Sequence, residues 1–156
     1  MMFCYRFVRL IETHADTLAA GLEKKVMSSP CVSSFQTIPV HEVRERVYEI
    51  YRHLGDWLLG KNQADIEQRY REIGARRARQ KVPLAEVIQV IVFTKDNLWD
   101  FLKSETVVDR AIEIMGELEL LQMLEQFFDR AIYFAAVGYQ EQVEHLRLQE
   151  REVLAG

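Results

Sequence analysis

Apolar residues recur along the chain with the three- and four-residue spacing of amphipathic helices, and short polar breaks separate these stripes. The widest stripe follows Pro83, whose fixed φ suits the first turn of a helix. Gly74 lies inside the preceding helix, where a glycine costs about 1 kcal/mol relative to alanine. We therefore expect another backbone to approach it closely. The apolar positions after the proline are Leu84, Val87, Ile88, Ile91, Val92, Leu98, Phe101 and Leu102.

The same spacing predicts five or six helices, with a polar loop over residues 28–39. Phe35 and Ile38 are the residues of this loop that we expect to reach the core. Asn62 or Asp65 is a candidate cap for the third helix, Ser104 or Thr106 for the last, and Gly60 a stop for the second. Helices are expected at about residues 3–27, 40–59, 62 or 65 to 80, 84–102, and from 104 or 106 onward, where Gly116 could kink or divide the chain. The sequence predicts an all-α fold, a single helical bundle with a long C-terminal helix, and one domain over residues 1–156.

Beyond Phe128 the pattern tightens to the seven-residue repeat typical of a coiled coil. Such a helix needs a partner, and a parallel copy of itself is the simplest one. Packing back on its own bundle is the alternative. We predict a homodimer, with residues 140–156 as a coiled-coil-like linker helix. The predicted dimer interface consists of Ile132, Ala136, Tyr139, Val143, Leu146 and Val153, with Glu150 at one polar seam position.

Composition restricts the class of protein. The chain has 156 residues, of which 49% are hydrophobic and 28% charged, as in soluble globular proteins. A net charge of −4 gives no reason to expect a nucleic-acid partner, and acidic residues interleave with the six cations between Arg69 and Lys81, which favours a solvated face. Two cysteines make no disulfide framework, and the uncharged runs are shorter than the ~20 residues of a membrane span. We expect a cytoplasmic protein without a membrane partner.

Three residues are candidates for a ligand-binding or switching role, namely Lys95, Tyr70 and His14. Lys95 falls inside an apolar stripe, where its stem could pack while the ammonium reaches solvent or a carboxylate. It could instead be a buried cation that meets an anionic ligand. His14 lies on the apolar side of the first helix, as a core residue or a ligand. Tyr70 shares an apolar face with Ile66 and Ile73.

No catalytic or metal-binding arrangement can be recognised in the sequence. Glu49 and His53 are four residues apart, but one such pair supplies too few ligands for a metal. A haem-binding globin needs an axial histidine facing a pocket. The scattered histidines are His14, His41, His53 and His145, none of them in the apolar helix after Pro83. The sequence predicts a non-enzymatic module without a cofactor, and a small-molecule or haem carrier is the alternative.

A family resemblance rests on features between about residues 10 and 145. These are the Trp57-Leu58 helix end, the spacing of Tyr70, Gly74 and Ala78, the pair Pro83-Leu84, the helix with Lys95 and Trp99, and the run Phe128-Asp129-Arg130-Ala131. In these features the chain resembles the N-terminal sensory domain of RsbR-type stressosome proteins, the RsbT co-antagonist (RsbRD-like) N-terminal family.

The resemblance implies a helical, dimeric input module of bacterial signalling, in RsbR-like members globin-like without haem. It also implies that a signal passes through the C-terminal helix to a downstream STAS-type or kinase-type effector. Neither kind of domain follows before Gly156. We expect a stand-alone module or the N-terminal part of a longer protein.

Overall fold

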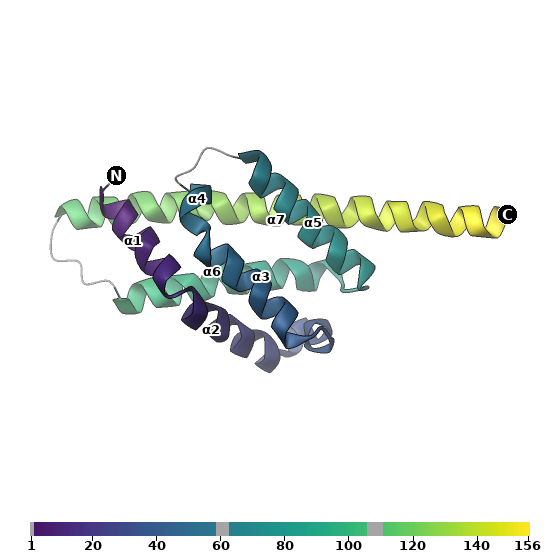
Figure 1. The fold of residues 1–156 in the computed structure, drawn as a ribbon, viewed down its shortest axis with the longest axis horizontal. Helices are drawn as coiled ribbons and strands as arrows, with labels where there is room; N and C mark the ends of the chain where they lie inside the picture. Colours follow the sequence, from purple (N-terminus) through teal and green to yellow (C-terminus); the bar gives the residue numbers. More distant parts are fainter. Residues whose placement is uncertain (1, 59–62, 106–110) are drawn as a thin grey trace.

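The computed structural model describes residues 2–58, 63–105 and 111–156, and within these ranges it contains helices and no strand (Figure 1). The all-α prediction is confirmed. The elements are α1 (Met2–Thr13), α2 (Ala15–Ser28), the 3₁₀ helix η1 (Pro30–Thr37), α3 (Val40–Arg52), α4 (Leu54–Leu58), α5 (Gln63–Arg79), α6 (Leu84–Glu105) and α7 (Ala111–Ala155).

Two helices that the sequence predicts as continuous are each broken at a histidine. The backbone leaves helical geometry at His14 (φ −103°, ψ 20°) and at His53 (φ −108°, ψ 12°). One contact joins the segments beside both breaks, because the Gly55 N–H donates to the carboxylate of Glu12 over 2.8 Å. The apolar stripe continues across each single-residue break, so the spacing of apolar residues gives no sign of it.

Other boundaries also differ from prediction. The loop over residues 28–39 contains η1, although Phe35 and Ile38 are buried as expected. Asp65 lies inside the first turn of α5, and α6 continues through Ser104, so neither residue is a helix cap. Gly116 does not divide α7. The predicted positions Gly60, Asn62 and Thr106 lie outside the described residues.

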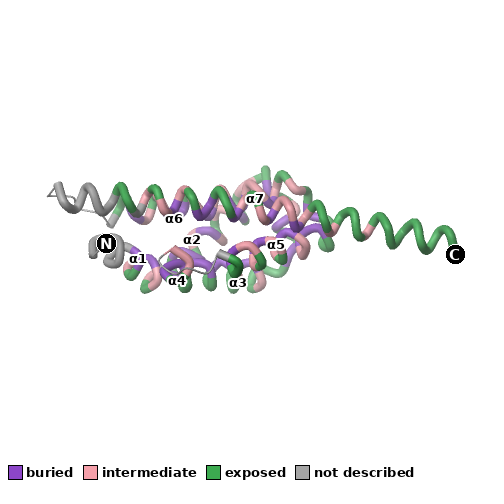
Figure 2. Tube along the Cα trace, turned by 90° about the horizontal axis from the view of Figure 1, so that it is seen from above, coloured by how far each residue is buried: buried purple, intermediate pink, exposed green. Residues whose placement is uncertain are grey.

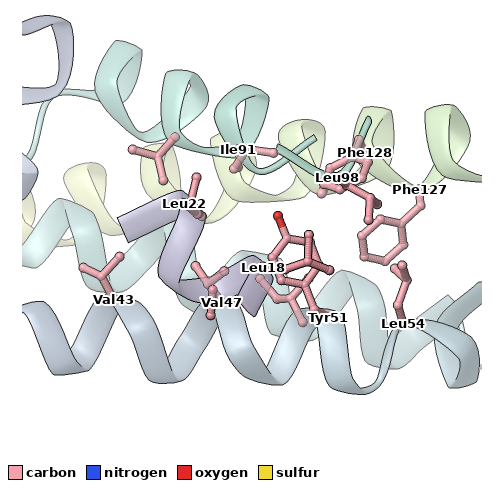
Figure 3. Packing of buried hydrophobic residues seen from close by; sticks show 14 of the residues in the cluster. Leu18, Leu22, Val43, Val47, Tyr51, Leu54, Ile91, Leu98, Phe127 and Phe128 are labelled. Carbon is pink, nitrogen blue, oxygen red and sulfur yellow. The ribbon is translucent and has the colours of Figure 1, made fainter. Parts of the chain in front are cut away.

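The long helix α7 runs along the whole molecule, and its last turns extend beyond the other helices (Figure 1). Residues of these last turns are mostly exposed (Figure 2). The seven helical elements before α7 and the middle of α7 enclose one core, and Figure 3 shows the contributions of α2, α3, α4, α6 and α7. The residues labelled there are Leu18, Leu22, Val43, Val47, Tyr51, Leu54, Ile91, Leu98, Phe127 and Phe128.

A small polar network crosses this core. The Tyr51 hydroxyl donates to the carbonyl oxygen of Thr94 over 2.7 Å, and the Asn97 amide donates to the carbonyl oxygen of Leu18 over 2.8 Å. The same amide also donates to the Tyr51 hydroxyl over 3.3 Å. Burial raises the pKa of Tyr51, so its hydroxyl stays protonated and remains a donor. Since buried polar groups need partners, this network fixes α2, α3 and α6 in one arrangement.

Two glycines bring the backbones of α5 and α7 into direct contact. A Cβ atom built on Gly74 would lie 1.9 Å from the carbonyl oxygen of Ala135. A Cβ atom on Gly138 would lie 2.0 Å from the carbonyl oxygen of Arg71. Both neighbours are backbone atoms and cannot swing aside. The prediction that another backbone approaches Gly74 is therefore confirmed.

Gly138→Ala should destabilise the protein, because the new methyl group forces α5 away from α7. Overpacking typically costs about 1 to 3 kcal/mol, which exceeds the gain of about 1 kcal/mol in helix propensity. Because the clash at Gly138 is with backbone atoms, the cost lies at the upper end of this range, and we expect a net loss of about 2 kcal/mol in the free energy of unfolding, measured by urea denaturation. At Gly55 the added carbon meets side-chain atoms of Glu12 and Val8, which can move, so Gly55→Ala should cost less. A stabilised Gly138→Ala variant would show that the contact is looser than described.

Candidate functional site

A groove of about 370 Å³ lies between α5 and the pair α3 and α4. It forms because α5 packs mainly against α7 whereas α3 packs mainly against α2, so side chains rather than backbones bridge the space between α3 and α5. Trp57 and Ile73 are its apolar side chains. Its charged side chains are Arg46, Glu49, Asp65, Arg69, Glu72 and Arg76, three of each sign.

A second cavity, of about 50 Å³, adjoins this groove inside the bundle. Arg46 and Ile73 line both spaces, so they mark the boundary between them. Tyr70 and Arg77 of α5 also line the inner cavity, and its other walls are mostly apolar. The apolar side chains from α3 and α6 are Val43, Val47, Ile50, Val87, Val90 and Ile91.

Tyr70 is a polar residue enclosed at this cavity. It is only 2% exposed, and its ring packs edge-on against Phe127 with 5.9 Å between ring centres. Burial raises the pKa of its hydroxyl, opposed by the positive charge of Arg69 and assisted by Tyr51. The Tyr70 hydroxyl is thus a neutral donor in the wall of the cavity.

Arg77 lines the inner cavity and pairs with Glu42 of α3. Its guanidinium lies 3.3 Å from the Glu42 carboxylate and donates to the side-chain oxygen of Gln80 over 2.7 Å. The same guanidinium lies 5.4 Å from the ring centre of Phe35. Burial lowers the pKa of Arg77, and Glu42 opposes this effect. For Glu42, burial alone raises the pKa. A hydrogen bond from Gln80 and the charges of Arg77 and Arg76 together lower it by more, so the net shift of the pKa is downward.

Arg69 bridges the groove. Its guanidinium forms an ion pair with Glu49 and lies 5.1 Å from the ring centre of Trp57, in cation–π contact. Between this pair and the Arg76–Glu42 pair, Arg46 of α3 and Glu72 of α5 line the middle of the groove. The structure gives neither of them an ion pair within the described part of the chain.

The structure separates the three predicted ligand or switch residues. Tyr70 lines the inner cavity, whereas Lys95 and His14 line neither space. The Lys95 ammonium lies 3.6 Å from the carboxylate of Glu125, with the two side chains 24% and 46% exposed. His14 stands at the break between α1 and α2, where its Nδ1 lies 2.9 Å from the carbonyl oxygen of Leu10 and its ring 5.3 Å from that of Phe101.

Sequence reasoning placed Arg77 on a solvated face, and this was wrong, because Arg77 is only 4% exposed. The signal was present in the chain. Ile66, Tyr70 and Ile73 define an apolar stripe whose next position, four residues on, is Arg77. Nothing in the sequence pattern indicated that Arg46 and Glu72 line a groove, because this depends on the distance between α3 and α5.

The residues of the predicted dimer seam fall into two groups. Ile132 and Tyr139 pack against the core of their own chain, and the Tyr139 hydroxyl donates to the carbonyl oxygen of Val82 over 2.5 Å. Ala136 is half-buried. Val143 is 37% exposed and Val153 is 79% exposed, with the half-buried Leu146 between them.

The described residues hold no group of three or more side chains suited to a metal ion. None of the four histidines lines the groove or the inner cavity. The groove, of about 370 Å³, lies within the 300–1,000 Å³ of typical ligand sites, and the inner cavity, of about 50 Å³, is far smaller. Within the described ranges, no helix combines the length and the apolar character that crossing a membrane requires.

Fold and site together define an all-helical module with a groove that could take a small ligand and with no recognisable reactive cluster in its described part. Residues 9–154 match the family described as the RsbT co-antagonist protein rsbRD N-terminal domain, and the chain belongs to this family. This family contributes sensory domains of stressosome type to stress signalling and is not known as enzymatic. No curated protein and no solved structure matches the chain.

Lys95→Met tests whether Lys95 is more than a surface residue. A partly exposed ion pair such as Lys95–Glu125 contributes about 0 to 1 kcal/mol, so we expect the free energy of unfolding to change by less than about 1 kcal/mol. Denaturant unfolding measures this change. A much larger loss would mean that Lys95 holds a buried anion, which the described geometry does not contain.

Glu42→Gln should weaken the bundle in a pH-dependent way. Because folding lowers the pKa of Glu42 below its usual 4.5, its contribution is present above that pH and is lost as pH falls through the folded-state pKa. The variant should therefore lose about 2 kcal/mol at neutral pH, and the difference from wild type should shrink in acid. Unfolding curves between pH 7 and pH 3 measure this. Glu45→Gln, an exposed change on the same helix, is the control, and a pH-independent loss would contradict the role of the Glu42 charge.

Proposed function

We propose that the protein is a non-enzymatic, dimeric sensory module that passes a signal through α7 to an STAS-type or kinase-type effector. The proposal rests mainly on the position of α7, which lies partly inside the bundle and partly beyond it. Its middle is part of the core through residues such as Phe128 and Ala131, which are 1% and 0% exposed. Its last turns project beyond the bundle (Figures 1 and 2). One rigid helix therefore belongs both to the folded module and to the surface that an effector could contact.

Two contacts support the idea that α7 follows movements of the rest of the bundle. The backbones of α5 and α7 touch at Gly74 and Gly138. The Tyr139 hydroxyl is bonded to the Val82 carbonyl, in the turn between α5 and α6. A displacement of α5 must move or strain α7, because the backbone contact at the two glycines cannot absorb it by a side-chain rotation.

The proposed dimer seam is the projecting part of α7. Val143, Leu146 and Val153 occupy the seam of the seven-residue repeat and meet no other helix of their own chain along most of that length. A second copy would cover them in a parallel coiled coil. Ile132, Ala136 and Tyr139 continue the seam toward the bundle, where they would line the base of the interface. Glu150 would face its own copy, and this like-charge contact would keep the distal seam weak enough to shift when the module changes state.

The double variant Val143→Asp with Leu146→Asp should dissociate the dimer, because it places four carboxylates in one seam. Multi-angle light scattering at micromolar concentration should give a dimer for the wild type and a monomer for the variant. Circular dichroism should show similar helix content in both, since the change lies outside the core.

Leu148→Asp is the matched control. Leu148 is 47% exposed on the same turns of α7 but lies on the side away from the seam, so this variant should remain dimeric. A monomeric wild type, or a double variant that stays dimeric, would show that the seam is not the signalling interface.

A further inference from the structure

The middle of the groove between α3 and α5 presents one positive and one negative side chain that are not paired with each other. Arg46 lines the α3 side and Glu72 the α5 side. The neighbouring charges are already engaged, since Glu49 pairs with Arg69 and Glu42 with Arg76 and Arg77. These pairs leave Arg46 and Glu72 available to a ligand that carries both signs of charge.

An apolar space begins where this charged pair ends. Arg46 and Ile73 line the groove and also the inner cavity, whose walls include Val47, Ile50 and Ile91. A buried water needs roughly 10–15 Å³ of such space, so about 50 Å³ corresponds to about four atoms of that size. This is room for a short branched aliphatic group.

We propose that the groove and the inner cavity bind a free α-amino acid with a short branched aliphatic side chain. The carboxylate of the amino acid pairs with the guanidinium of Arg46, which suits a two-pronged hydrogen bond. Its ammonium pairs with Glu72, and its side chain enters the cavity. A phosphate-bearing ligand fits less well, because the charged side chains of the groove balance each other and would oppose a strongly anionic group.

This inference rests on the proposed sensory function for its consequence, namely that the amino acid is the signal. A ligand held by Arg46 and Glu72 bridges α3 to α5, which otherwise meet through side chains. Since α5 touches α7 at Gly74 and Gly138, a change in the spacing of α3 and α5 reaches the helix that projects from the bundle. Binding would thus shift the population of α7 positions.

Isothermal titration calorimetry on the whole chain tests the site. L-leucine and L-valine should bind, whereas isovalerate lacks the ammonium, isoamylamine lacks the carboxylate, and each should bind about tenfold more weakly or not at all. Arg46→Gln and Glu72→Gln should each weaken leucine binding by about tenfold or more. Arg44→Gln and Glu45→Gln, on exposed positions of α3 that line neither space, should bind leucine as the wild type does.

Three results would overturn the inference: no heat of binding with leucine or valine at millimolar concentration, isovalerate binding as tightly as leucine, or leucine binding unchanged in both charge variants. Circular dichroism of the variants confirms that they are folded. Calorimetry measures ligand binding whether the protein is a monomer or a dimer. A monomer that binds leucine would therefore contradict only the dimeric signalling proposal, and a dimer that binds no amino acid would contradict only this inference.

Discussion

The backbone contact between α5 and α7 determines where the other parts of the molecule can be. At Gly74 and Gly138 each helix presents its main chain to the other, at a distance that a single methyl group would prevent. At 3.6 residues per turn, Arg69, Glu72 and Arg76 lie on the face of α5 opposite Gly74. This face points away from α7 and lines the groove. The close approach on one side of α5 therefore accounts for the open space on the other.

Several polar groups of the interior hold helices together through hydrogen bonds and ion pairs. Tyr51, Asn97 and Thr94 satisfy one another or nearby carbonyl groups, and Arg77 satisfies Glu42. The contacts of Tyr51 join α3 to α6 and the Arg77–Glu42 pair joins α5 to α3, two pairs of helices that share little backbone contact, whereas the Thr94 hydroxyl bonds within α6. The Tyr70 hydroxyl is equally buried but lines a cavity. Because burial keeps this hydroxyl protonated, a ligand that entered the cavity would lie beside a neutral polar group.

The helical class, the core stripes and the special role of Gly74 could be predicted from the sequence, because each depends on local spacing or on the absence of one side chain. The breaks at His14 and His53 could not, since an apolar stripe keeps its phase across one residue. The burial of Arg77 could have been predicted from its place four residues after Ile73. Its positive charge instead favoured the prediction of an exposed position. The groove was not predictable, because its existence depends on how far apart two helices lie after each has packed elsewhere.

The seven-residue repeat of α7 runs through two different surroundings. Toward the bundle the repeat is used within the chain, since Ile132 packs on the core and Tyr139 is bonded to Val82. Past Gln142, whose side chain still accepts a hydrogen bond from Arg79, the same repeat continues after the other helices have ended. A periodic pattern contains no mark of that boundary, because it depends on where α5 stops and not on α7 itself. The helix α7 is therefore continuous across the point where its packing against α5 ends, and the proposed dimer would use the part beyond that point.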